Sequence, residues 1–274
     1  MGAQDNYERL VARIGQLESA LVAYSGGVDS TLLAVTAHAV LGERCAAVLA
    51  TGDTQPAEEV AAARELAGEL GLRLLEVETY ELADPRFAAN PPDRCYWCKG
   101  ELFSLLARVA DVNGFSVVID GSNADDLADY RPGRQACIEL GILSPLAEVG
   151  MGKDDIRAIA KDLGLPNWDK PSMACLASRF PYGTPITEEA LVRVAEAESA
   201  LRTLGVSQSR VRAHGELARV EVEPTELDCA WERREAIASA VRDAGFTWVA
   251  LDLDGYRSGA LNEALGEQDR ATRS

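Results

Sequence analysis

The stretch 20–40, "ALVAYSGGVDSTLLAVTAHAV", constrains the fold of this chain more than any other segment. Its short apolar run predicts a buried strand, the paired glycines predict a tight turn, and the apolar-rich continuation predicts a helix. Backbone N–H groups and hydroxyls in such a turn point at whatever occupies the carboxyl edge of the sheet. We therefore expect the turn "SGGVDS", Ser25–Ser30, to bind phosphate.

Each residue type in this turn suits that role. Gly26 and Gly27 are expected to take positive φ and to let a ligand approach the backbone closely. Ser25 and Ser30 add hydroxyl donors, and Asp29 is expected to hold Mg²⁺ against the phosphates. An ordinary strand-to-helix turn that merely contains two glycines is the alternative. The strand before the turn and the helix after it favour the phosphate loop.

Strand and helix patterns continue to alternate up to about residue 165, which predicts an α/β fold with a parallel sheet and helices on both faces. The apolar content of 47% includes only 6% aromatic residues, so small and branched aliphatic side chains must fill the core. Further strands are expected at 44–53, 72–79 and 116–123, and further helices at 55–71, 99–114 and 153–164.

The segment 166–185, "PNWDKPSMACLASRFPYGTP", is too rich in proline and small residues for a helix, and we place a domain boundary before it. The expected domains are 1–165 and 166–274. The second is predicted to be a smaller α+β domain, with helices at 187–205 and 226–245, two strands around Gly215, and a last strand at 247–255.

The net charge of the chain limits the classes of molecule that it is expected to bind. A formal net charge of −17 repels polyphosphate chains, so nucleic acid is not expected as a partner, whereas a small anion in a locally basic pocket is compatible. The chain shows neither a signal-peptide pattern nor a membrane-length apolar run, so we expect a soluble cytoplasmic protein without membrane contact. In a reducing compartment its six cysteines are expected as thiols, ligands or catalysts.

The C-x-x-C motif in "NPPDRCYWCKGELF" places Cys95 and Cys98 at a helix start, where the helix dipole and nearby basic residues favour thiolates. A redox pair, a structural zinc site and plain packing are open interpretations. A further one adds the distant Cys175, which gives three thiolates for an iron–sulfur cluster with one iron open to an exchangeable ligand. The remaining cysteines are expected to be small apolar fillers: Cys45, Cys137 and Cys229.

"SGGVDS" matches the S-G-G-x-D-S pattern and resembles the loop of the PP-loop ATP pyrophosphatases, the adenine nucleotide alpha hydrolase-like enzymes. The resemblance implies that ATP is cleaved to AMP and pyrophosphate while a carboxylate is adenylated. It also implies that "LATGDT", with Thr51, holds the adenosine, and that Asn123 and Asp125 lie beside the phosphates. Asp125 fits a helix N-cap almost as well as a magnesium ligand.

Longer motifs in the same order resemble the LarE family of ATP-dependent sulfur transferases: "NPPDRCYWCK", "DGSNADDLADYRPG", "WDKPSMACLASRFPYG" and "RVRAHGELARVEV". The resemblance implies that the carboxylates of pyridinium bis-carboxylic acid mononucleotide become thiocarboxylates, for the nickel-pincer nucleotide cofactor of lactate racemase. In single-cysteine members the cysteine matching Cys175 gives up its own sulfur and becomes dehydroalanine. Because Cys95 and Cys98 are also present, we favour the version in which three cysteines carry a 4Fe-4S cluster with an extra sulfide.

The resemblance also implies roles for residues around the substrate. Ser178 and Arg179 would hold the substrate phosphate or AMP, and Trp97 would stack on the pyridinium. Arg210 and Arg212 alternate on a strand and would form a basic patch for the mononucleotide phosphate, unless they pair with surface acids. The C-terminal domain would serve substrate binding and oligomerisation, with a homo-hexamer expected and the sulfur donor unassigned. Acidic residues expected near the phosphate through a metal are Glu198, Glu221 and Asp228.

Three other functions fit parts of the pattern. A tRNA-thiolating PP-loop enzyme also uses cysteines and ATP, but the acidic charge argues against RNA binding. An ammonia-using amidating synthetase predicts indifference to the loss of Cys175. A non-enzymatic ATP-binding module predicts binding of ATP without release of pyrophosphate.

Overall fold

The computed structural model describes residues 2–127, 132–171, 174–257 and 259–261. The chain divides into two compact units. Unit 1 comprises Met1–Tyr80 and Asp93–Met173, and unit 2 comprises Glu81–Pro92 and Ala174–Ser274. None of the helices in the described parts of the chain is long and apolar enough to cross a membrane.

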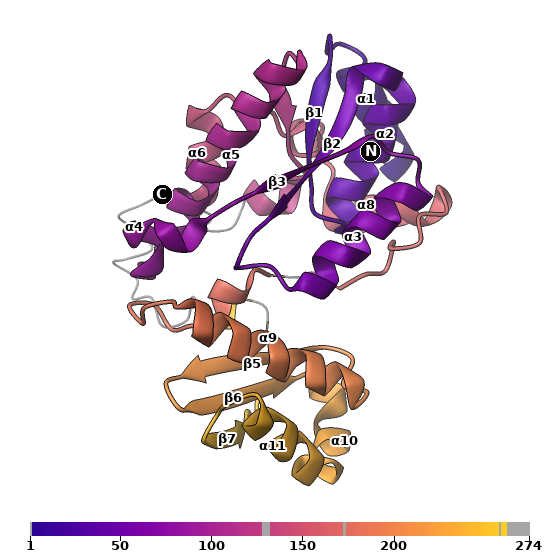
Figure 1. Cartoon of the computed structure of the whole chain (residues 1–274). Helices are drawn as coiled ribbons and strands as arrows, with labels where there is room; N and C mark the ends of the chain where they lie inside the picture. The colour runs from indigo at the N-terminus through magenta and orange to yellow at the C-terminus, as the bar shows by residue number, and fades with distance from the viewer. Residues whose placement is uncertain (1, 128–131, 172–173, 258, 262–274) are drawn as a thin grey trace. The chain divides into compact units, whose positions relative to one another are not determined.

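Unit 1 is an α/β structure around a parallel sheet with strand order β3-β2-β1-β4. Figure 1 labels the strands β1, β2 and β3 of this sheet. The predicted alternation of strands and helices is confirmed. Its strands are β1 (Ala20–Tyr24), β2 (Cys45–Thr51), β3 (Leu74–Glu78) and β4 (Val118–Ile119). Its helices are α1 (Ala3–Ile14), α2 (Val28–Leu41), α3 (Ala57–Glu69), α5 (Arg94–Asn113), α6 (Pro132–Glu139), α7 (Pro145–Glu148) and α8 (Lys153–Asp162).

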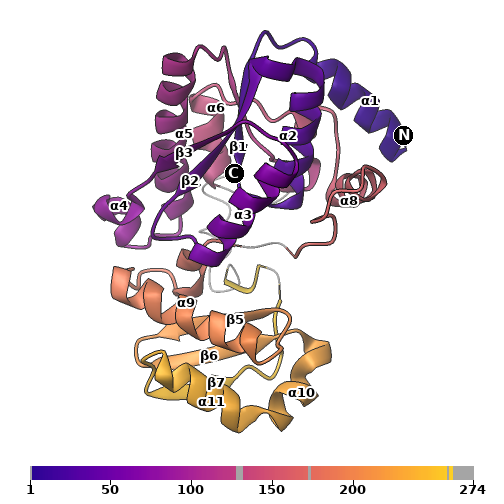
Figure 2. The same ribbon diagram turned by 45° about the vertical axis from the view of Figure 1, so that its right-hand side comes forward.

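The central strands are buried on both faces, as the continuous apolar runs in the sequence predict. Val22 and Tyr24 of β1 pack in the core beneath α1, α2, α3 and α8, whereas Leu21 packs in the core beneath α5 and α6. Successive side chains of a strand point to opposite faces, so one short strand supplies both cores. Figure 2 shows the two helix layers on either side of the sheet.

Unit 2 is an α+β structure with sheet order β5-β6-β7. The strands β5 (Ser209–His214) and β6 (Leu217–Val222) pair antiparallel around Gly215, as predicted, and β7 (Trp248–Leu251) adds in parallel beside β6. The helices of this unit are α4 (Pro85–Ala88), α9 (Glu188–Thr203), α10 (Leu227–Glu232) and α11 (Arg234–Asp243).

Two expectations about these segments differ from the structure. The single helix predicted for 226–245 is split into α10 and α11 at Arg233, whose side chain donates to the carbonyl of Leu204. The segment 81–92, expected in the first domain, packs within unit 2. The reason is a set of long-range hydrogen bonds from Asn90, whose Nδ2 donates to the carbonyls of Pro181 at 2.8 Å and Thr184 at 2.9 Å.

Candidate functional site

The loop Ser25–Ser30 connects β1 to α2 at the carboxyl edge of the sheet and is closed by its own hydroxyls. The backbone N–H of Ser25 donates to Ser30 Oγ at 3.2 Å, and the two hydroxyl oxygens lie 3.1 Å apart. Ser30 Oγ also donates to the carbonyl of Gly27 at 3.1 Å. The two serines therefore fix the shape of the loop before any ligand arrives.

The two glycines of the loop have different roles. Gly26 has φ of +70°, and a Cβ there would lie 2.6 Å from the Cβ of Ala63 on α3, so glycine is required twice over. Gly27 has φ of −77°, so the expectation of positive φ at both positions is wrong for Gly27. Gly27 instead caps α2 without a side chain, which leaves the first N–H groups of the helix to an anionic ligand.

Asn123 connects the loop to the turn that follows β4. It is fully buried, and its Nδ2 donates to Asp29 Oδ2 at 2.8 Å while its Oδ1 accepts from the N–H of Asp125 at 3.0 Å. Burial raises the pKa of Asp29, the Asn123 hydrogen bond opposes this rise, and the nearby Asp126 adds to it. Such a carboxylate is favoured in its charged form when a cation lies beside it.

Asp125 caps a helix. Its Oδ2 accepts from the N–H of Lys153, the first residue of α8, at 2.7 Å. Gly152, the residue before α8, lies against the same carboxylate: a Cβ added to Gly152 would lie 3.0 Å from Asp125 Oδ1. The capping interpretation therefore describes the geometry, although the capped helix is α8 rather than the turn that contains Asp125.

Thr51 ends β2 at the same edge of the sheet as the loop. Tyr24, the last residue of β1, is in register with Leu49, so Ser25 lies at about the level of Ala50, one residue before the end of β2 at Thr51. The hydroxyl of Thr51 donates to the carbonyl of Val77 at 3.3 Å. The role of Thr51 beside the adenosine stays a prediction.

The turn after β4 is held by a carboxylate that sequence reasoning missed. Asp120 is buried and accepts hydrogen bonds from the hydroxyls of Ser122 and Ser144, each at 2.7 Å. Next to it, a Cβ on Gly121 would lie 3.0 Å from the N–H nitrogen of Ser30, so only glycine lets this turn approach the start of α2 closely. The aspartate in "IDGSN" was the available signal, because a carboxylate beside serines commonly closes such turns.

Asn167 is a second missed residue. Its Nδ2 donates to the carbonyl of Gly26 at 3.1 Å and to Thr31 Oγ1 at 3.0 Å, and only 8% of the residue is exposed. Its Oδ1 is buried without a hydrogen-bond partner in the described residues. No local pattern marks Asn167, because its partners lie at the other end of unit 1 in sequence.

Cys95 and Cys98 lie in the first turns of α5, one turn apart, as predicted. Cys95 is exposed and Cys98 is partly exposed. Between them, Trp97 packs edge-on against Tyr96, with ring centroids 5.1 Å apart. Helix α6 packs against the motif. A Cβ added to Gly133 of α6 would lie only 3.1 Å from the carbonyl oxygen of Cys95.

Cys175 belongs to unit 2, whereas Cys95 and Cys98 belong to unit 1. Cys175 is exposed and begins the short 3-10 turn Leu176–Arg179. Across the described residues, no three histidine, cysteine or acidic side chains gather closely enough to hold a metal ion. The convergence of the three cysteines remains a prediction.

The other cysteines are partly as expected. Cys45 and Cys137 are buried core residues, and burial raises the pKa of each thiol to about 11. Cys229 is exposed on α10, so the expectation that it fills the core is wrong. The neighbouring Asp228 is exposed as well, whereas Ala230 of the same helix is buried.

The arginines predicted to bind phosphate are buried in ion pairs. Arg179 is fully buried and makes a bidentate pair with Glu198, with both N–O distances 2.8 Å. Arg212 makes a bidentate pair with Glu221 at 2.9 and 2.7 Å. The alternative of pairing with acids therefore describes Arg212, although Glu221 is only 1% exposed rather than a surface acid.

Arg210 lies beside these pairs. Its guanidinium sits 5.1 Å from the ring centroid of Tyr256, and Nη1 donates to the carbonyl of Ser209 at 2.8 Å. Burial lowers the pKa of Arg210, and the neighbouring Arg179 and Arg212 lower it further. The predicted basic cluster exists, but it is buried and largely neutralised.

The carboxylates expected around a metal are not assembled for that purpose. Glu198 and Glu221 hold arginines, and Asp228 is exposed in the first turn of α10. Among the residues that the structure describes they form no common ligand group. These residues do not fit a metal in this arrangement.

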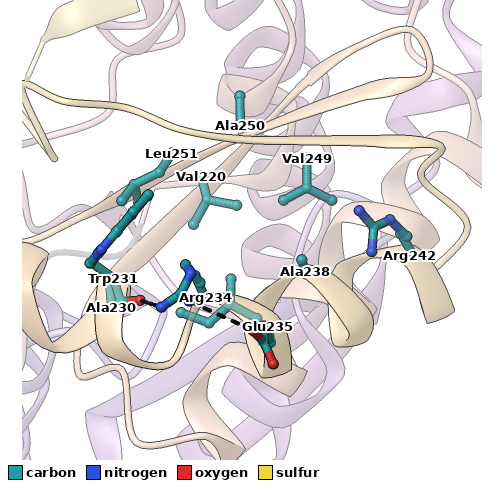
Figure 3. Close-up of a pocket in the computed structure, with 11 residues that line it drawn as sticks. Val220, Ala230, Trp231, Arg234, Glu235, Ala238, Arg242, Val249, Ala250 and Leu251 are labelled. Carbon is teal, nitrogen blue, oxygen red and sulfur yellow. Dashed lines mark hydrogen bonds and ion pairs between the residues drawn. The ribbon is translucent and has the colours of Figure 1, made fainter.

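Unit 2 also contains a cavity of about 370 Å³ between α10, α11 and the sheet (Figure 3). Trp231 and Leu251 stand at one end and Arg242 at the other, over an apolar floor that includes Val220 and Val249. Among the described residues, Glu235 is its only acidic lining residue, and no cysteine, serine or histidine lines it. The described lining therefore offers no nucleophile for sulfur or acyl chemistry.

Comparison with known proteins places the geometry in a family. A family model described as NAD synthase matches residues 4–89, which contain the phosphate loop. Over 264 residues the chain is 39% identical to the pyridinium-3,5-bisthiocarboxylic acid mononucleotide synthase of Lactiplantibacillus plantarum, covering 96% of both chains. The chain belongs to the LarE family.

Two further relatives are similar to this chain. An uncharacterized protein of Synechocystis sp. is 46% identical over 264 residues, covering 96% of this chain and 98% of that protein. The glutamine-hydrolyzing GMP synthase of Chlamydia caviae is 28% identical over 193 residues, covering 63% of this chain and 35% of that protein. The LarE-family chain is therefore an enzyme of the ATP-using PP-loop type.

Proposed function

We propose that this enzyme is an ATP-dependent sulfurtransferase that converts the carboxylates of pyridinium-3,5-biscarboxylic acid mononucleotide into thiocarboxylates. The proposal rests on one observation: the same chain contains both a closed phosphate loop and an exposed thiol, Cys175. This chain is related over 96% of its length to a synthase of the bis-thiocarboxylate product. The product belongs to the biosynthesis of the nickel-pincer nucleotide, with a lactate racemase as the expected client.

The first half-reaction is adenylation. A substrate carboxylate oxygen attacks the α-phosphorus of ATP, and pyrophosphate leaves. The N–H groups at the start of α2 suit the pyrophosphate. The hydroxyls of Ser25 and Ser30 would exchange their mutual hydrogen bond for one to the pyrophosphate, and Thr51 would lie on the adenosine side. Each such preorganised donor typically contributes about 3 kcal/mol to transition-state stabilisation.

Asp29 is the residue that would hold Mg²⁺ against the phosphates. Its Oδ2 accepts from Asn123, and no hydrogen bond from the described residues reaches its Oδ1. Burial and Asp126 raise the pKa of Asp29, and a bound cation would favour its charged form. Mg²⁺, when bound, would offset the charge of the departing pyrophosphate.

The second half-reaction replaces AMP by sulfur. In the version we favour, Cys95, Cys98 and Cys175 would hold a 4Fe-4S cluster, which supplies an exchangeable sulfide when bound. The exposure of Cys95 and Cys175, and the one-turn spacing of Cys95 and Cys98, fit thiolate ligands. In the alternative, the Cys175 thiolate attacks the acyl carbon and AMP leaves. A base then removes the cysteine Cα proton as the Cβ–S bond breaks, which yields thiocarboxylate and dehydroalanine.

The test is anaerobic turnover with ATP and the bis-carboxylate mononucleotide, following pyrophosphate and thiocarboxylate together. Brown protein with about four irons per chain, whose mass is unchanged after turnover, is the expected result. Colourless protein that loses one hydrogen sulfide in mass per thiocarboxylate would replace the cluster by the sacrificial route. Pyrophosphate release without any thiocarboxylate would overturn the sulfurtransferase itself.

The cysteine variants separate the two routes further. Cys95→Ala and Cys98→Ala should stop turnover after at most one equivalent of product, because each removes a cluster ligand. Cys229→Ala is the matched control, since Cys229 is exposed like Cys95 but lies outside the motifs. Unchanged multiple turnover in Cys95→Ala would exclude the cluster.

A further inference from the structure

The loop that carries Cys175 is held by hydrogen bonds to its backbone carbonyls as well as by the buried side chains of Leu176 and Phe180. Arg179 Nη1 donates to the carbonyl of Ala174 at 2.8 Å, to the carbonyl of Cys175 at 3.3 Å and to Ser178 Oγ at 2.8 Å. The Cys175 side chain itself stays exposed. One guanidinium group therefore fixes the backbone on both sides of the thiol.

Arg179 is fixed in turn from α9 and β5. Its Nε and Nη2 donate to the two carboxylate oxygens of Glu198, and Glu198 Oε1 also accepts from the backbone N–H of Val211 at 2.9 Å. The Arg179 and Glu198 side chains are 0% and 2% exposed. Bidentate pairing of this kind fixes both position and orientation of the guanidinium plane.

A second arginine–glutamate ion pair, between strands β5 and β6, contacts the same loop. Arg212 of β5 uses Nε and Nη2 on the two oxygens of Glu221, and its remaining Nη1 donates to the carbonyl of Ser178 at 2.8 Å. Both side chains are at most 9% exposed. The same loop is thus held at its start by Arg179 and at its end by Arg212.

We propose that Arg179 and Arg212, each oriented by its carboxylate, are positioning residues that hold the Cys175 loop for sulfur transfer, rather than ligands of the substrate phosphate. Their N–H donors are engaged by carboxylates and loop carbonyls within unit 2, which leaves little for a phosphate. This inference rests on the proposed function for its kinetic part only.

The kinetic consequence follows from the geometry that nucleophilic attack requires. A displacement of about 1 Å between reacting atoms can slow a reaction about 100-fold. Lysine has no planar fork and cannot hold a carboxylate and two carbonyls together. Arg179→Lys and Arg212→Lys should therefore lower kcat for thiocarboxylate formation about 100-fold while pyrophosphate release changes by less than about threefold.

The control is Arg219→Lys. Arg219 binds the same Glu221 at 3.1 Å and also pairs with Asp252, but it contacts no carbonyl of the loop in the described residues. Its variant should leave both half-reactions within about twofold of the unchanged protein. Arg219→Lys removes an arginine from the same group of charges without removing a contact with the loop. A difference between this variant and Arg212→Lys therefore measures the contribution of the loop contact.

A readout independent of catalysis is hydrogen exchange of the backbone amides at 174–180. Ser178 N donates to Cys175 O and Phe180 N to Ala177 O, so loosening of the loop exposes both amides. We expect exchange about tenfold faster in Arg179→Lys and Arg212→Lys, and unchanged in Arg219→Lys, with thermal melting to verify folding.

Unchanged exchange, or a KM for the mononucleotide that rises while kcat is constant, would overturn the proposal and return these arginines to the substrate phosphate. If the unchanged protein forms no thiocarboxylate, the proposed function fails, and the exchange data alone still decide whether the loop is held in this way. If one variant does not fold, the other tests the same claim, because the two pairs are separate.

Discussion

Asn167 Nδ2 donates a hydrogen bond of 3.1 Å to the carbonyl of Gly26, across 141 positions of the chain. The same nitrogen also donates to Thr31 Oγ1 in the first turn of α2. One buried amide therefore joins the end of unit 1 to both sides of the phosphate loop. These two hydrogen bonds hold the loop at Gly26, where the backbone has positive φ.

Asn167→Ala should raise the KM for ATP about tenfold, because the loss of one or two net hydrogen bonds of about 1 kcal/mol each frees the loop. Thr36→Val is the matched control: Thr36 lies in α2, is buried, and bonds the carbonyl of Leu32 without touching the loop. Initial rates of pyrophosphate release at varied ATP measure the effect. Equal KM values in the two variants would show that Asn167 supports only the fold.

The phosphate loop could be predicted because everything that identifies it is local. A strand, two glycines, two hydroxyls and a helix lie in consecutive positions, and their chemistry needs no distant partner to be recognised. The alternating strands and helices of unit 1 follow from the same local periodicity. Asn167 has no such marker, because its function depends on residues that only folding brings near.

The same distinction explains the arginines of unit 2. Sequence alternation correctly placed Arg210 and Arg212 on one strand, but it carried no information on which carboxylates face them. Glu198 and Glu221 come from α9 and β6, so their pairing is a property of tertiary packing. The break of the predicted helix at Arg233 likewise depends on a contact with the distant Leu204.

Gly26→Ala and Gly27→Ala should differ sharply in stability. At Gly26 alanine would need a left-handed backbone conformation, which costs about 1–2 kcal/mol, and its Cβ would clash with Ala63. At Gly27 φ is −77° and the nearest atom to a new Cβ is Ser25 Oγ at 3.4 Å. Urea unfolding should show a loss of at least about 2 kcal/mol in Gly26→Ala and less than about 1 kcal/mol in Gly27→Ala. Similar losses would contradict the assigned roles.

Asp29→Asn should stabilise the ligand-free protein at neutral pH. Burial raises the pKa of Asp29 in the folded state, so folding favours its neutral form, and its contribution to stability falls as pH rises from the ordinary aspartate range through the raised pKa. Asparagine is neutral throughout. The melting temperature of Asp29→Asn should therefore exceed that of the unchanged protein at pH 7, with the gap closing toward acid pH. A gap that widens toward acid pH would mean that Asp29 is stabilised in its charged form.

Alkylation should divide the cysteines by burial. Burial raises the pKa of Cys45 and Cys137 to about 11, so few of these thiols are ionised at pH 8 and both are shielded from reagent. Cys95, Cys175 and Cys229 are exposed. Iodoacetamide labelling of the cluster-free protein, read by peptide mass spectrometry, should modify these three within minutes and the two buried thiols only after unfolding. Rapid labelling of Cys137 would contradict its place in the core.

Asp125 offers a direct choice between capping and metal binding. Its carboxylate accepts from the first N–H of α8, so Asp125→Ala should lower the free energy of unfolding by about 1 kcal/mol, whereas Asp125→Asn keeps an acceptor oxygen and should lose only a few tenths. A capping role predicts that both effects appear in ligand-free protein and are insensitive to Mg²⁺. A magnesium ligand predicts instead that Asp125→Asn shifts the Mg²⁺ concentration for half-maximal pyrophosphate release at least tenfold. Asn123 connects the two sites, because it donates to Asp29 of the phosphate loop and accepts from the backbone N–H of Asp125. The KM for ATP of the two variants therefore also shows whether loss of the cap at α8 affects the phosphate loop.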